Sequence, residues 1–150
     1  MRYLVTHGER NDGADPGHTS EGLGQIRSIK LPKGIAQVVV GTGRRHWEVN
    51  EEVAAQLPEG VAVKTSPHCG SADSLNSDKT TITLSNGKTV KLSDYIGIET
   101  SCFDAWEFIE SQPDGTLFCA GGELMMALGC KAKRGKLYEL DVETRTACES

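Results

Sequence analysis

The chain has 150 residues, of which 16 are basic and 21 acidic, so its net charge is -5. This length suits one domain, residues 1–150, with a core large enough to fold without disulfides or a structural metal. The acidic balance argues against nucleic acid or an anionic membrane surface as a partner.

The chain also lacks the sequence signals of export and of metal binding. No apolar run is long enough for a signal peptide or a membrane span, so we expect a cytoplasmic protein. The 5 cysteines are an odd number and contain no CxxC pair, which predicts neither a disulfide framework nor a zinc site. We expect no bound metal and no cofactor, and we interpret His18, His46, His68 and Cys69 as structural or surface residues.

The first third of the chain alternates predicted strands and helices. Short β-prone or apolar runs predict strands at 2–6, 36–40 and 61–64. Helical spacing and Thr or Ser at the start predict a helix at 19–29, and a second helix follows at 44–57. Such alternation builds a parallel sheet with helices on both faces.

The rest of the chain adds a different element before it returns to this pattern. Residues 81–84 and 90–92 flank Asn86-Gly87, a pair that favours a tight turn, and so predict a β-hairpin. A helix is expected at 102–109, a buried strand at 116–120 and an apolar helix at 123–128. The charged, alternating run 136–142 suits an edge strand. We therefore predict an α/β three-layer sandwich: a mostly parallel sheet, helices on both faces, an antiparallel edge strand and an inserted hairpin.

Three loops should carry the chemistry, because ligands of such sheets bind beyond the carboxyl ends of the strands. They are residues 6–10, 41–45 and 120–122. They bring a histidine, His7, together with several arginines. Arginines bind a phosphoryl group through charge-assisted hydrogen bonds, and an imidazole can attack it without a metal. Gly8 would let the backbone approach such a ligand.

At these residues the chain resembles the histidine phosphatase (phosphoglycerate mutase-like) superfamily. That family opens with a strand ending in Arg-His-Gly, and this chain has Thr6-His7-Gly8. The family's Thr-x-x-Gly-x-x-Gln matches Thr19, Gly22 and Gln25. Its phosphate-binding arginine after the second strand corresponds best to Arg45. Its late strand ends in His-Gly, whereas Ala120-Gly121 stands here, so two phosphate-pocket residues differ: Thr6 replaces an arginine and Ala120 a second histidine.

The resemblance implies a small metal-independent phosphomonoesterase in which His7 is transiently phosphorylated. It implies that Arg45, with Arg10 or Arg44, stabilises the transferred charge, and that an acid protonates the leaving oxygen. For this acid we choose Asp73, with Glu9 and Glu99 as alternatives. The full predicted site is catalytic His7 and Asp73, with phosphate bound by Thr6, Gly8, Arg10, Arg44, Arg45 and Gly121. The partner would be a small phosphorylated molecule or a phosphoprotein.

A second hypothesis follows from the two replaced residues. The chain could be a catalytically degenerate member that binds an anionic ligand or a protein partner without turnover. Thr19 and Gln25 also have an ordinary explanation, as a helix cap and a solvated side chain. Arg44 and Arg45 open a helix, where cations are unfavourable against the helix dipole, which indicates an anion, although a simple surface pair explains them nearly as well.

Overall fold

The computed structural model describes residues 1–13, 16–69, 81–83, 89–91 and 105–150. Within this part of the chain, the main feature is a six-stranded sheet in the order β3-β2-β6-β1-β7-β8. Neighbouring strands are parallel from β3 to β1, and β7 and β8 are antiparallel additions beside β1. The strands are β1 (Arg2–Thr6), β2 (Gln37–Val40), β3 (Ala62–Thr65), β6 (Thr116–Ala120), β7 (Leu137–Asp141) and β8 (Thr146–Glu149). The predicted α/β class, with a mostly parallel sheet and an antiparallel edge, is confirmed.

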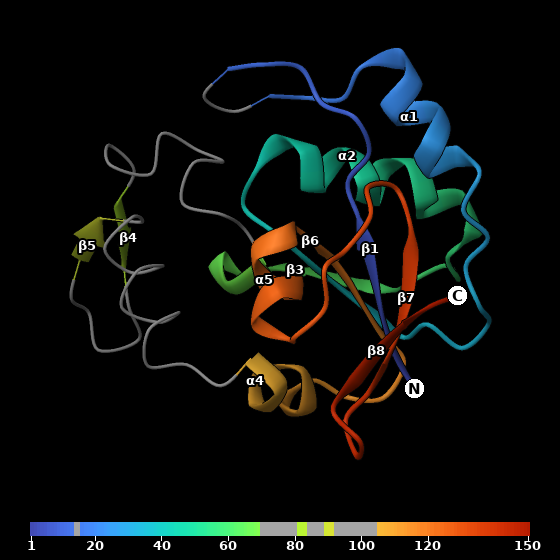
Figure 1. Ribbon diagram of the computed structural model, residues 1–150, viewed down its shortest axis with the longest axis vertical. Helices are drawn as coiled ribbons and strands as arrows, with labels where there is room; N and C mark the ends of the chain where they lie inside the picture. The colour runs from blue at the N-terminus through green and yellow to red at the C-terminus, as the bar shows by residue number, and fades with distance from the viewer. Residues whose placement is uncertain (14–15, 70–80, 84–88, 92–104) are drawn as a thin grey trace.

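Helices cover both faces of the sheet (Figure 1). They are α1 (Ser20–Arg27), α2 (Arg44–Val53), α4 (Ala105–Ser111) and α5 (Gly122–Ala127), with short 3-10 turns at η1 (Ala54–Gln56) and η2 (Pro67–Cys69). The helices α1 and α2 pack on one face, where Ile26 and Val49 are fully buried. The helices α4 and α5 pack on the other, with Ile109 and Met125 in the core.

The two cores explain why the central strands read as continuous apolar runs. Successive side chains of a strand point to opposite faces. In β6, Leu117 packs on the α1–α2 side and Phe118 on the α4–α5 side, and both are fully buried. In β1, Val5 packs on the α1–α2 side and Leu4 on the α4–α5 side. A strand covered on both faces buries side chains on both of its sides, which explains the mainly apolar runs.

Most boundaries agree with the sequence-based expectation to within two residues, but the ends of two helices and the edge of the sheet differ in a way that has a reason. The helix expected at 44–57 is α-helical only to Val53 and ends in η1, because Leu57 precedes Pro58 and takes the extended backbone that proline imposes on its neighbour. The helix expected at 102–109 is found as α4, which runs on to Ser111. The run 136–142 forms β7, but β8 pairs outside it, so β7 is not the outermost strand. The run Thr146–Glu149 is short and mostly exposed, and gave no apolar signal.

The predicted hairpin is present as β4 (Thr81–Thr83) paired antiparallel with β5 (Thr89–Lys91). Its turn at Asn86-Gly87 lies outside the described residues. Over the described ranges, no helix is long and apolar enough to cross a membrane.

Candidate active site

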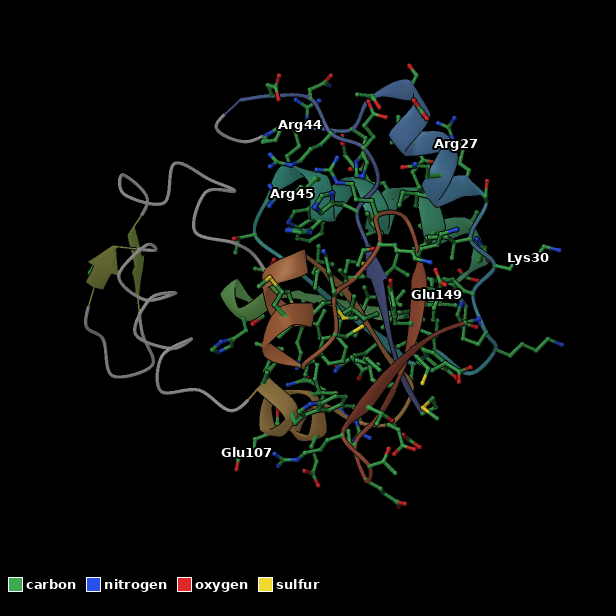
Figure 2. The ribbon with its side chains drawn as sticks, in the orientation of Figure 1. Arg27, Lys30, Arg44, Arg45, Glu107 and Glu149 are labelled. Carbon is green, nitrogen blue, oxygen red and sulfur yellow. The ribbon has the colours of Figure 1, made fainter. Side chains whose placement is uncertain are left out.

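The loops that follow β1, β2 and β6 meet at one end of the sheet, as the parallel arrangement predicts. His7 follows β1, and its ring centroid lies 5.9 Å from that of His46 in the first turn of α2. The amide of Gly41, after β2, donates to the carbonyl of Cys119 in β6 at 2.9 Å. Figure 2 shows the labelled Arg44 and Arg45 at the start of α2, beside the loop that follows β1.

His7 is held in one tautomer. Its side chain is almost buried, with 9% of the residue exposed. The Nδ1 atom lies 2.8 Å from the carbonyl oxygen of Gly8. A carbonyl oxygen only accepts hydrogen bonds, so the ring proton is on Nδ1 and the lone pair is on Nε2. Burial, opposed in part by this hydrogen bond and aided by the charge of Arg45, lowers the pKa of His7 to about 4. The imidazole is therefore neutral at pH 7, which is its nucleophilic form.

Arg45 brings a buried positive charge to this site. It is the second residue of α2 and only 3% exposed. Its charge acts on both His7 and His46, lowering the pKa of each after the larger effect of burial. The helix N-terminus adds partial positive charge at the same place. A buried cation at a helix N-terminus, beside a neutral imidazole, is an environment that favours an anion.

The other predicted arginines, Arg44 and Arg10, are not buried as Arg45 is. The Arg44 side chain is 64% exposed, and its Nε lies 3.4 Å from Oε2 of Glu48, so it reaches along the helix. Arg10 forms a backbone bridge with His18 in the loop after β1. Glu9 is half-buried in the same loop, whereas Asp73 and Glu99 lie outside the described residues.

A histidine that sequence reasoning left out of the site supports the His7 loop. Nε2 of His18 accepts from the amide of Gly8 at 2.9 Å, so its ring proton is on Nδ1. Nδ1 lies 2.9 Å from Oε1 of Glu48, which also accepts from the His18 amide at 2.6 Å. This chain of bonds ties the peptide next to His7 to α2. No spacing rule reveals it, because His18 and Glu48 are 30 residues apart.

The Thr-x-x-Gly-x-x-Gln segment builds the other side of this loop. Thr19 caps α1 by accepting from the amide of Gly22 at 3.0 Å. Gly22 lies directly against the backbone of Glu9, where a Cβ would overlap the Glu9 carbonyl. Gln25 accepts from the Glu9 amide through Oε1 at 2.9 Å. The cap is confirmed, but Gln25 is not a simple solvated side chain.

Thr6 connects β1 to the loop before β7. Its hydroxyl donates to the carbonyl of Lys133 at 2.7 Å and accepts from the amide of Lys136 at 3.1 Å. The same loop meets His7, whose carbonyl accepts from the Gly135 amide at 2.9 Å. Arg134 is exposed in this loop, and its charge contributes to lowering the pKa of His7. No sequence motif indicated Arg134.

The residues at the end of β6 are packed into the fold. Ala120 is fully buried in the core beneath α4 and α5. The amide of Gly121 donates to the carbonyl of Cys69 at 3.0 Å, so this donor is already occupied. Burial raises the pKa of the Cys69 thiol far above its usual range and that of Cys119 to about 12. Neither thiol is a thiolate at neutral pH, which agrees with a structural role for both.

No grouping of three or more His, Cys, Asp or Glu side chains suited to a metal ion occurs among the residues that the structure describes.

The fold defined by this sheet and its helices is that of the histidine phosphatases. No protein-family model and no curated protein matches the sequence. Among solved structures, the protein histidine phosphatase SixA, complexed with tungstate, aligns with a TM-score of 0.51 and 14% identity over 99% of this chain and 93% of its own.

Two further structures show the same likeness. The alpha-ribazole phosphatase from Shigella flexneri aligns with a TM-score of 0.58 and 12% identity over 99% of this chain and 94% of its own. The protein TTHB049 from Thermus thermophilus aligns with a TM-score of 0.56 and 18% identity over 93% of this chain and 92% of its own. At such identities the likeness shows the fold alone, and in fold this chain is similar to solved histidine phosphatases.

Proposed function

We propose that the protein is a small metal-independent phosphomonoesterase that works through a phosphohistidine on His7. The observation that carries the proposal is the hydrogen bond from Nδ1 of His7 to the Gly8 carbonyl. It leaves the lone pair on Nε2, at the end of the sheet, where the charge of the buried Arg45 acts on the ring. With its pKa near 4, His7 carries this lone pair at neutral pH without needing a general base.

The chemistry has two steps. In the first, Nε2 of His7 forms a bond to phosphorus while the bond from phosphorus to the leaving oxygen breaks, and an acid gives that oxygen a proton. In the second, water attacks the phosphohistidine and gives one proton to the conjugate base of that acid, the nitrogen–phosphorus bond breaks, and orthophosphate leaves a neutral His7. Arg45 stabilises the negative charge on the phosphoryl oxygens throughout. Asp73 is the acid that the sequence favours, with Glu9 and Glu99 as alternatives.

The substrate is a small phosphorylated molecule or a phosphoprotein. An alternative role, binding of an anionic ligand or a protein partner without turnover, is favoured by Thr6 and Ala120. The Thr6 hydroxyl is engaged by backbone groups, and Ala120 offers no polar group to a ligand. Loss of one electrostatic donor typically costs about two to three orders of magnitude in rate, so two losses would leave a weak enzyme.

The test is phosphatase activity on an aryl phosphate and a panel of phosphorylated metabolites, in the presence of a chelator. His7→Ala is compared with the wild type and with His68→Ala, a matched loss of imidazole from η2. We expect turnover in the wild type and in His68→Ala, and none in His7→Ala. The wild type should also form an acid-labile, alkali-stable phosphoprotein after a rapid quench.

Two results would contradict the proposal. A surviving rate in His7→Ala would remove His7 as the nucleophile. Background rates in all three proteins would favour the binding protein without turnover, and the same panel would then be screened for binding.

A further inference from the structure

His46 is a fully buried histidine whose ring makes no hydrogen bond within the described part of the chain. It is 0% exposed, and both Nδ1 and Nε2 are without a hydrogen-bond partner. A neutral imidazole has one donor and one acceptor nitrogen. A buried donor or acceptor that lacks a partner carries its full desolvation penalty. Such a group in a native fold needs an explanation, and a ligand that is not part of the chain is one explanation.

The position of the His46 ring places it at the candidate active site. Glycines at the ends of β2 and β6 make room for it. A Cβ on Gly41 would lie 2.5 Å from Cδ2 of the ring, and a Cβ on Gly121 would lie 3.4 Å from Cε1. The ring thus lies where the carboxyl ends of two neighbouring strands meet, with its centroid 5.9 Å from that of His7.

The surroundings of the ring select an anionic partner. Arg45 precedes His46 in α2, and its charge acts on both histidines. Burial, helped by Arg45 and His7, lowers the pKa of His46 well below its usual value, so the ring is neutral and keeps one N–H. A neutral N–H beside a buried cation is a hydrogen-bond donor for an oxyanion.

We propose that His46 donates a hydrogen bond to an oxygen of the phosphoryl group that His7 attacks. This inference rests on the proposed function. It also accounts for the absence of a histidine at Ala120: an imidazole reaches the phosphoryl group from the first turn of α2 instead of from the end of β6.

The first experiment compares the activity of two folded variants in which His46 is replaced. His46→Leu introduces an apolar side chain of similar volume and removes the donor, whereas His46→Gln keeps a side-chain N–H. We expect kcat/KM to fall about 100- to 1,000-fold in His46→Leu, the usual loss for one oxyanion donor, and by a smaller factor in His46→Gln. His68→Ala serves as the control and should match the wild type. Equal kcat/KM in His46→Leu and the wild type would overturn the proposal.

The second experiment does not depend on turnover. Inorganic phosphate is titrated into 15N-labelled wild type and into His7→Ala, and the ring nitrogens of His46 are followed by NMR. We expect one His46 nitrogen to shift as phosphate binds, in both proteins. Saturation of the phosphate site with no change at His46 would refute the proposed contact, whether or not His46→Leu folds.

The two experiments separate the two proposals. If His7→Ala keeps its activity, the phosphohistidine mechanism fails, and the phosphate-induced shift of His46 still decides whether this ring binds the anion. If His7→Ala is inactive and His46 neither shifts nor affects kcat/KM, the mechanism stands and only the role of His46 is lost.

Discussion

Gly8→Ala should displace the peptide that holds His7. A Cβ on Gly8 would lie 2.5 Å from the carbonyl oxygen of Gly22 and 2.7 Å from Oε1 of Gln25. The first of these is backbone, which cannot turn away. To reach the 3.4 Å at which ordinary contact begins, the loop and α1 must separate by about 0.9 Å. Overpacking of this kind costs about 1–3 kcal/mol of stability. A displacement near 1 Å at a reacting group costs about 100-fold in rate.

The control is Gly24→Ala in α1, the helix that faces Gly8, where an added Cβ meets no atom within 4 Å. Alanine is preferred to glycine inside a helix by roughly 0.5–1 kcal/mol, so this variant should be slightly more stable than the wild type and equally active. Urea unfolding followed by circular dichroism measures the stability, and kcat/KM on an aryl phosphate measures the activity. If Gly8→Ala proves as stable and as active as Gly24→Ala, the loop does not depend on this close approach and the reasoning is wrong.

Three further predictions concern charge and hydrogen bonding around the loop. The His7 ring should stay neutral down to about pH 4 in an NMR titration, and a midpoint near 6.5 would contradict its burial. Because the folded pKa of His7 lies below the unfolded value of 6.5, its contribution to stability is complete above about pH 6.5 and is lost as pH falls towards 4. Burial opposes the charged form of Glu48, but hydrogen bonds from His18 outweigh it and lower the pKa of this carboxyl. Glu48→Gln should therefore lower the free energy of unfolding by about 1 kcal/mol at pH 7 in urea unfolding, and this difference should shrink as pH falls through and below the usual carboxyl pKa. A difference independent of pH would mean that the charge is not involved. Thr6→Val should lower the free energy of unfolding by about 1–3 kcal/mol, because it leaves the carbonyl of Lys133 without its hydroxyl donor, and an unchanged urea midpoint would show that water replaces that donor.

Local sequence patterns predicted the elements that build the site. Continuous apolar runs identified β1, β2 and β6, and since parallel strands place their carboxyl ends together, His7 and Arg45 could be expected at the same end of the sheet. The structure places both there. The hairpin and the helix cap at Thr19 were equally local, since Asn-Gly and an N-cap hydroxyl act within a few residues.

What the sequence could not reveal depends on contacts between distant segments. His18 supports Gly8 only because α2 brings Glu48 beside it. The burial of His46 follows from two glycines that lie far apart in the chain. Histidines also fill cores and coat surfaces, so their type alone does not separate these roles from a site. The outer strand β8 was missed because it is short, exposed and without apolar periodicity.

The close contact between Gly41 and the His46 ring limits which substitutions the sequence can accept at these two positions. Residue 41 has to lack a side chain for as long as residue 46 is a histidine, because the ring fills the space that any Cβ at 41 would need. Exchange of His46 for a small residue would remove the nearer of two obstacles, since the carbonyl oxygen of Cys69 would still lie 2.9 Å from a Cβ at residue 41. The two positions should therefore be coupled during divergence, and a substitution at 41 becomes less harmful once 46 has already changed.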